Sequence, residues 1–327
     1  MKKKIFSIIQ ILVTLALLFY LSRKVNLKES FVIMKQVNIY LLILSGILCF
    51  IFLLISNLRW KILLDARGIK FPFGYLLKVY FVSWFFNNIL PTTIGGDVLR
   101  VAYTVKKDAV TGRPITSPAL AAAFVDRFIG FIGLFFFAVL ASGILFLFKI
   151  GRNQYLLIDL LGFIILVVIL LAVFSDRVHR IFSKIFSRIK FFKLAERFER
   201  AYVEVKEYRQ VKTKLLYCFL LSLLVQVSIA SVWFTIAVGI SVTKSILYYF
   251  LYIPVLGVIT MVPSVGGLGI RENGFVNMFN TFVGIAKEKA TAISGLYLIV
   301  NFIFALIGGF VYLFIKRQST STKTGGL

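Results

Sequence analysis

Long apolar runs constrain this chain more than any other feature of its sequence. A helix needs about 20 predominantly apolar residues to cross a bilayer, and six runs approach or exceed that length. They cover residues 5–21, 39–58, 128–148, 155–174, 215–239 and 290–315, with the helix of the third run expected to start near Ala119. Apolar residues fill 60% of the 327 positions, which excludes an ordinary cytosolic enzyme. The runs predict an all-α polytopic membrane protein with six full transmembrane helices.

The first run follows three lysines and has two readings. It is either a secretory signal peptide or a retained first helix. The run ends in Tyr20, Leu21, Ser22 and Arg23, without the small-x-small pattern of a cleavage site. We therefore expect a retained helix.

Two further apolar stretches are interrupted by proline and glycine. Proline removes an amide donor and glycine weakens a helix, so each stretch predicts two helical arms joined by a break. We interpret both stretches as re-entrant helical hairpins. The breaks cover residues 91–96 and 263–269; they join arms over 79–90 and 97–106 in the first stretch and over 246–262 and 270–286 in the second.

Positive charge supports this topology. The chain has 38 Lys and Arg against 13 Asp and Glu. If both hairpins return to the side they entered from, 27 basic residues fall on the side of the N-terminus and 10 on the opposite side. The bias predicts both termini in the cytoplasm; the family resemblance given below implies the plasma membrane of a prokaryote. Because the charge lies beside apolar runs, we expect no nucleic-acid partner.

The same layout divides the single transmembrane domain into two halves, 1–150 and 151–327. Each half reads helix, helix, hairpin, helix, and the two halves start on opposite sides. In each hairpin a proline precedes the pattern GGxxxR, which ends at Arg100 in the first and Arg271 in the second. This is typical of an inverted-repeat transporter, although two independent helix breaks would leave the same short similarity.

The segment 175–214 is strongly basic, with twelve Lys and Arg and five acidic residues. Apolar residues recur in it at helical spacing, which predicts a helix on the cytoplasmic leaflet. It serves either as a topology anchor or as a lipid-recognition site.

The two breaks are the candidate binding region. Irregular backbone at membrane depth is tolerated only where protein or a water-filled cavity surrounds it. Each second arm turns the positive end of a half-helix toward the break, which favours an anionic group such as a lipid phosphate. Arg100 and Arg271 would add full charges there, unless each extends to an interface. Gly95, Gly96, Gly266 and Gly267 form the breaks themselves.

Further polar residues accompany the breaks. Asp97 is expected to cap its helix or to meet a cationic group. Glu272, if deep, requires a partner or a function. Asp126 and Arg127 diverge by about 100° on their helix, so each is expected to meet a different neighbour. Asn88 supplies an amide to the first break, where it satisfies freed backbone groups or contacts substrate.

Other residues restrict the chemistry. The single histidine, His179, leaves no His-based triad or metal cluster. Cys49 and Cys218 each lie in an apolar run and are read as small buried hydrophobes. Arg59 and Trp60 are read as an interfacial anchor. We expect no catalytic residue, metal or cofactor, and no ATP-binding motif is present.

These motifs resemble the transmembrane domain of the lysylphosphatidylglycerol synthetase/flippase family. The resemblance rests on five features: Asn88 and Pro91 leading to Gly95, Gly96, Asp97 and Arg100; the pair Asp126 and Arg127; Arg59 and Trp60; the break 263–269; and Glu272. It covers essentially the whole chain. It implies a protein that moves or handles membrane lipids, among them the aminoacylated phosphatidylglycerol that confers resistance to cationic antimicrobial peptides.

Bifunctional members of that family carry a soluble aminoacyltransferase domain after the membrane part, and no such domain is expected within this chain. Our leading hypothesis is a flippase-like translocase for an anionic or aminoacylated phospholipid, such as lysylphosphatidylglycerol, or for a polyprenyl-phosphate-linked lipid. The alternatives are a membrane-embedded transferase on a lipid carrier, with Asp97, Asp126 or Glu272 as general base, and a scaffold for a separate lipid synthase. The expected partners are membrane lipids and, under the last reading, that synthase.

Overall fold

Helices form almost all of the structure. The computed structural model describes residues 2–90, 95–107, 114–148, 203–260 and 264–315, with isolated positions between 161 and 168. The helices are α1 (Lys2–Lys24), α2 (Leu27–Lys35), α3 (Ile39–Ala66), α4 (Phe73–Ile89), α5 (Gly95–Tyr103), α6 (Ser117–Leu147), α10 (Lys212–Gly239), α11 (Ile246–Ile259), α12 (Ile270–Met278) and α13 (Lys287–Phe314). Short helical turns are η1 (Glu207–Val211), η2 (Val265–Gly267) and η3 (Phe279–Val283), and β1 (Lys106–Lys107) pairs antiparallel with β2 (Pro114–Ile115). The helical class is confirmed.

Four helical segments in the described ranges are long and apolar enough to cross a membrane: Ile39–Ala66, Ser117–Ile144, Val203–Gly239 and Lys287–Phe314. A helix of 28 residues is about 42 Å long, which exceeds the hydrocarbon thickness. Helix α1 covers the first predicted run. Except for isolated positions, the predicted helix over 155–174 lies outside the described residues, as does most of the basic segment 175–214. The chain is a multi-pass membrane protein, and the number of six spans stays a prediction.

Both interrupted stretches fold as two helices that pack against each other. Helix α4 lies on α5, and α11 lies on α12. The bounds differ from the prediction, because α5 ends at Tyr103 and the expected end of its arm, Lys106, belongs to β1. Helix α12 ends at Met278 and continues as the π turn η3. The return of each hairpin to the side it entered from stays a prediction.

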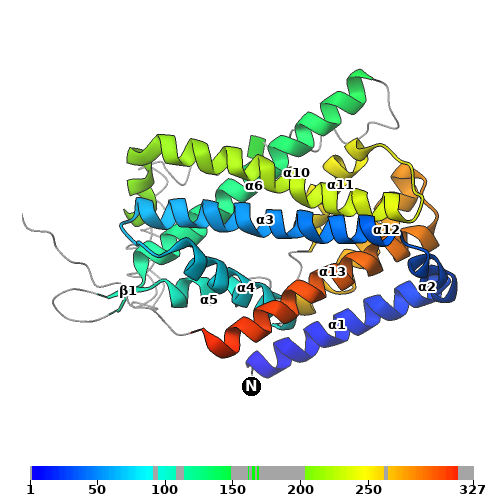
Figure 1. Ribbon diagram of the computed structural model, residues 1–327, viewed down its shortest axis with the longest axis horizontal. Helices are drawn as coiled ribbons and strands as arrows, with labels where there is room; N and C mark the ends of the chain where they lie inside the picture. Colours follow the sequence, from blue (N-terminus) through cyan, green and yellow to red (C-terminus); the bar gives the residue numbers. More distant parts are fainter. Residues whose placement is uncertain are drawn as a thin grey trace, which may run out of the picture.

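A short helix occupies residues that the topology assigned to a connection. The Oδ1 of Asn26 accepts a 3.2 Å hydrogen bond from the amide of Glu29 and caps α2. The Oδ1 of Asn38 likewise accepts from the amide of Tyr40 and caps α3. Helix α2 packs against α13 and lies at the opposite end of the molecule from β1 (Figure 1).

Close helix packing positions the hairpins. Helices α3 and α10 run side by side along the long axis of the molecule (Figure 1). Helix α4 approaches α13 so closely at Gly308 that a Cβ there would lie 2.0 Å from the carbonyl oxygen of Phe81. Small residues allow such approach between membrane helices. A stack of aromatic rings fills the core nearby, with the ring centroid of Trp233 4.0 Å from that of Tyr297 and 4.4 Å from that of Phe275.

Candidate functional site

A cavity of about 420 Å³ lies where both helix breaks meet the long helices. Its walls come from α3, α4, α5, α6, α10, α11, η2, α12 and α13. Eight of the eleven candidate binding residues line it: Asn88, Asp97, Arg100, Asp126, Arg127, Gly266, Gly267 and Arg271. The other three, Gly95, Gly96 and Glu272, are not part of the lining. The fold therefore brings residues beside the first predicted break and the glycines of the second to one place.

A buried ion-pair network occupies one wall. The Nε of Arg59 donates to the Oδ1 of Asp126 at 2.7 Å, and its Nη1 donates to the hydroxyl of Ser222 at 2.6 Å. The guanidinium of Arg100 donates to the Oδ2 of Asp126 at 3.3 Å and to the Oδ1 of Asp97 at 3.1 Å. The network thereby connects α3, α5, α6 and α10. Pairing of this kind is what makes charges tolerable away from water.

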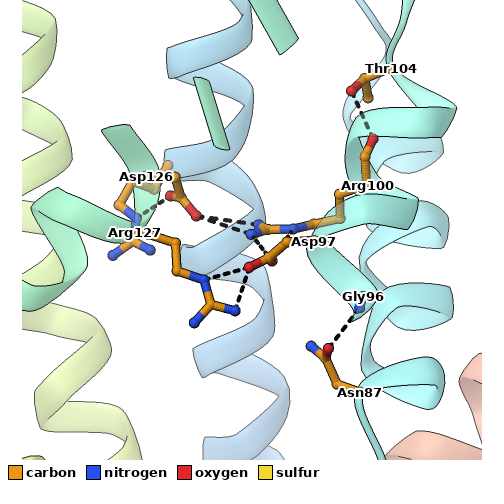
Figure 2. A network of polar contacts seen from close by, with 8 residues as sticks. Asn87, Gly96, Asp97, Arg100, Thr104, Asp126 and Arg127 are labelled. Atoms are coloured by element: carbon orange, nitrogen blue, oxygen red, sulfur yellow. Dashed lines mark hydrogen bonds and ion pairs between the residues drawn. The ribbon is translucent and has the colours of Figure 1, made fainter. Parts of the chain in front are cut away.

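Arg127 extends the network from α6 toward α5. Its guanidinium pairs with the Oδ2 of Asp97, and Figure 2 shows the side chain reaching from α6 to that carboxylate. Asp126 and Arg127 do meet different direct partners. The expectation of different neighbours is confirmed, and Arg100, which binds both Asp97 and Asp126, joins the two contacts. The long arginine side chain spans the divergence between adjacent helix positions.

Both arginines of the GGxxxR patterns are buried. Arg100 is 4% exposed, and its guanidinium carbon lies 4.7 Å from the ring centroid of Trp60 and 4.9 Å from that of Tyr80. Arg271 lies 5.1 Å from the ring centroid of Tyr297 and pairs with Glu272 at 2.9 Å. These contacts hold each guanidinium inside the protein. The alternative that either side chain extends to the membrane surface is wrong.

The side chain of Asn87 binds the start of α5 after the first break. The Oδ1 of Asn87 accepts a 2.8 Å hydrogen bond from the amide of Gly96 at the start of α5 (Figure 2). A Cβ on Gly96 would lie 2.3 Å from the carbonyl oxygen of Ser83, so only glycine lets α5 lie this close to α4. Asn87 thus satisfies the amide at this helix start, and the carboxylate of Asp97 is directed at two arginines instead.

The second break depends on left-handed glycines. Gly266 and Gly267 have φ of 59° and 76°, values that favour glycine. The Oε2 of Glu272 accepts a 2.6 Å hydrogen bond from the amide of Gly269 and caps α12, while its Oε1 binds Arg271. Glu272 is buried and paired, as a deep carboxylate requires. A Cβ on Gly266 would lie 2.6 Å from the carbonyl oxygen of Asn88, so the second break touches the end of α4.

Asn88 takes part in a ring of hydrogen bonds between α4 and α13. Its Oδ1 accepts from the Nδ2 of Asn301 at 2.9 Å, and its own Nδ2 donates to the carbonyl oxygen of Trp84 at 2.9 Å. The indole of Trp84 donates to the Oδ1 of Asn301 at 2.7 Å. The three side chains satisfy one another on the cavity wall, so Asn88 does more than serve the freed backbone.

Sequence reasoning misplaced Arg59 and Trp60. The interfacial anchor is wrong, because Arg59 is 7% exposed and Trp60 is fully buried. Helix α3 continues eight residues beyond the apolar run that ends at Leu58, and its last turns are covered by neighbouring helices. Arg59 is a member of the ion-pair network and of the cavity wall.

Two further cavity residues, Gln226 and Asn301, were not singled out from the sequence. Each is a lone amide inside a long apolar run. Polar residues within membrane helices usually face the interior and mark functional regions. That signal was available and would have found both.

The lining of the cavity carries more arginine than aspartate. The charged residues lining it in the described ranges are four arginines and two aspartates: Arg59, Arg100, Arg127, Arg271, Asp97 and Asp126. Helices α5 and α12 both begin at the breaks, and helix N-termini favour negative charge. Within the described ranges no three potential metal ligands of the His, Cys, Asp or Glu type come together. The arrangement suits binding of a phosphate through guanidinium groups.

Comparison with known proteins shows which family this chain belongs to. The family model described as the lysylphosphatidylglycerol synthase TM region matches residues 7–309. A UPF0104 membrane protein of Pyrococcus horikoshii is 28% identical over 352 aligned residues, which cover 99% of this chain and all of that protein. A UPF0104 membrane protein of Methanothermobacter thermautotrophicus is 28% identical over 146 residues, covering 45% of this chain and 40% of that protein. No solved structure matches the chain. The chain therefore belongs to the family of the lysylphosphatidylglycerol synthase transmembrane region.

Proposed function

We propose that this protein is a lipid translocase that carries a lipid with an anionic head group across a prokaryotic plasma membrane. The observation that carries the proposal is the cavity at the two helix breaks, where four arginines meet two aspartates. A phosphate group is matched by guanidinium donors, which bind it through paired hydrogen bonds. The lipid tails stay in the bilayer while the head group occupies the cavity.

The position of the two hairpins beside the cavity supports a role in transport. Transporters place their binding sites at broken helices near the middle of the membrane, with half-helix N-termini directed at anionic substrate groups. Helices α5 and α12 have that relation to the cavity, since Asp97 and Arg100 of α5 and Arg271 of α12 line it. Re-entrant hairpins and cytoplasmic termini complete the proposed topology.

The packing of the helices supports an inverted repeat. Helices α3 and α10, the second helices of residues 1–150 and 151–327, pack on each other. Helix α4 of the first hairpin packs on α13, the last helix of the second half. Helix α11 of the second hairpin packs on α6, the last helix of the first half. This reciprocal exchange is expected of two halves related by a pseudo-twofold axis, and rocking of the halves would alternate access to the cavity.

The substrate class follows from family and charge together. We place in it an anionic or aminoacylated phospholipid, such as lysylphosphatidylglycerol, or a polyprenyl-phosphate-linked lipid, supplied by a separate synthase. The carboxylates of Asp97, Asp126 and Glu272 each bind at least one arginine. Because arginine already occupies each of these carboxylates, the arrangement favours translocation over a membrane-embedded transferase.

Reconstitution tests the proposal. Proteoliposomes carrying a fluorescent phosphatidylglycerol are treated with a quencher that reaches only the outer leaflet. Wild-type protein is expected to accelerate exchange between leaflets, and Arg271→Gln to slow it by about tenfold or more. Arg67→Gln is the matched control, because Arg67 is also ion-paired, with Glu204, but does not line the cavity.

Two results would contradict translocation. The first is a wild-type exchange rate equal to that of protein-free vesicles. The second is a new lipid species, detected by mass spectrometry after incubation with lipid donors and acceptors, which would favour the transferase instead.

A further inference from the structure

The four arginines of the cavity differ in how much of their surface the protein covers. The side chains of Arg59, Arg100 and Arg271 are 8%, 5% and 11% exposed. The side chain of Arg127 is 33% exposed. Of these four residues, Arg127 therefore has the most exposed side chain.

Arg59 and Arg100 are held too firmly to turn toward a ligand. Arg59 donates to both Asp126 and Ser222. Arg100 donates to two carboxylates and lies between the rings of Trp60 and Tyr80. Moving either one would leave a buried carboxylate with fewer partners, which is costly. Their geometry is that of positioning residues.

Arg127 differs because it combines the greatest exposure of the four with a carboxylate partner that Arg100 also binds. Asp97 binds Arg127 through Oδ2 and Arg100 through Oδ1. If Arg127 turns away, Asp97 keeps its ion pair with Arg100. Figure 2 shows both guanidinium groups on the same carboxylate.

We propose that Arg127 is the residue that receives the anionic group of the lipid, and that Asp97 competes with that group for it. The inference rests on the proposed function for the identity of the ligand as a lipid phosphodiester. On binding, a phosphate oxygen takes the place of Asp97 Oδ2 as the acceptor of the Arg127 guanidinium. On release, Asp97 takes the guanidinium back. One charge-assisted hydrogen bond replaces another, so the guanidinium keeps a counter-charge throughout.

The proposal predicts opposite effects for the two partners, and the chain carries its own reporter. Of its three tryptophans, Trp84 and Trp233 line the cavity and Trp60 lies against Arg100. Tryptophan fluorescence of the purified protein in detergent is titrated with dihexanoyl phosphatidylglycerol. Arg127→Gln is expected to weaken binding by about tenfold or more. Asp97→Asn is expected to tighten binding by about threefold to tenfold, since it removes the competitor.

The double variant separates competition from a structural role. Asp97→Asn together with Arg127→Gln is expected to bind as weakly as Arg127→Gln alone, because Asp97 acts through Arg127. Arg127→Lys, which keeps the charge but loses the planar fork, is expected to bind with intermediate affinity. Arg67→Gln serves again as the control and is expected to bind like wild type.

Three results would overturn the proposal. Wild-type affinity in Arg127→Gln would remove Arg127 from the site. Weakened binding in Asp97→Asn, with its thermal midpoint retained, would make Asp97 a ligand contact rather than a competitor. If Asp97→Asn does not fold, Arg127→Gln and Arg127→Lys decide. Saturation by inorganic phosphate with the same affinity as the lipid would assign the site to a free anion.

Failure of this inference is distinguishable from failure of the proposed function. If the binding pattern appears but vesicle exchange is not accelerated, the assignment of Arg127 stands and translocation fails. If exchange is accelerated but Arg127→Gln binds normally, translocation stands and the assignment fails.

Discussion

Arg59 of α3 and Asp126 of α6, 67 positions apart in the chain, are joined by a 2.7 Å ion pair whose side chains are only 8% and 3% exposed. Asp126 also forms an ion pair with Arg100 of α5, so one carboxylate balances the charge of two buried guanidinium groups. This relationship links the first hairpin to the long helices. It makes Asp126 the residue on which the wall of the cavity depends most.

Asp126→Asn is therefore expected to destabilise the protein. Two arginines would lose a buried counter-charge, and breaking a buried pair costs about 3–5 kcal/mol. Thermal unfolding in detergent measures the loss. Asp65→Asn is the matched control, because Asp65 pairs with Lys61 where both side chains are partly exposed, and its loss costs less than about 1 kcal/mol. Equal midpoints for the two variants would contradict the role given to Asp126.

Gly308→Ala is expected to separate α13 from α4. The new Cβ would lie 2.0 Å from the carbonyl oxygen of Phe81, and overpacking of this kind costs about 1–3 kcal/mol. Gly143→Ala in α6 is the control, because nothing lies within 4 Å of a Cβ there, and alanine favours a helix by up to about 1 kcal/mol. A lowered thermal midpoint in the control and not in Gly308→Ala would refute the close contact.

Asn301→Leu is expected to break the ring that joins α4 and α13. The indole of Trp84 and the amide of Asn88 would each lose a partner. Hydrogen bonds between membrane helices are worth about 0.6–1.7 kcal/mol in double-mutant cycles. A cycle with Asn88→Leu, followed by thermal unfolding, measures the coupling. Strictly additive effects would show that the two amides do not act together.

Gly266→Ala is expected to slow lipid exchange by about tenfold or more, because its Cβ would push the second break away from Asn88. Gly284→Ala separates this effect from backbone strain. Gly284 also has a left-handed φ, 72°, but it does not line the cavity. Both variants carry about 1–2 kcal/mol of strain, so equal exchange rates in the two would contradict a functional contact between the second break and α4.

Much of the fold follows from local sequence signals. Apolar runs marked the long helices to within a few residues at most ends, and proline with glycine marked both breaks. The end of α3 was placed eight residues early, because the run of apolar residues stops at Leu58 while the helix continues to Ala66. Polar residues at the end of an apolar run show that the helix reaches water only if no other helix covers those residues.

Sequence signals located some residues of the candidate site and missed others, because only local patterns can be read from a sequence. Arg100 and Arg271 stood out because they follow helix breaks, which is a local pattern. The role of Arg59 depends on contacts with Asp126 and Ser222, which lie 67 and 163 positions away. In the sequence, Arg59 and Trp60 stand at the end of an apolar run, as residues at a membrane interface do. Only the packing of the helices shows that both side chains are buried.

A density map of the protein in lipid nanodiscs containing phosphatidylglycerol would locate the head group itself. We expect density for a phosphate within hydrogen-bond distance of the guanidinium groups of Arg127 and Arg271. A cavity without head-group density, in a map that resolves lipids only around the outer surface, would contradict binding of the lipid at the two hairpins.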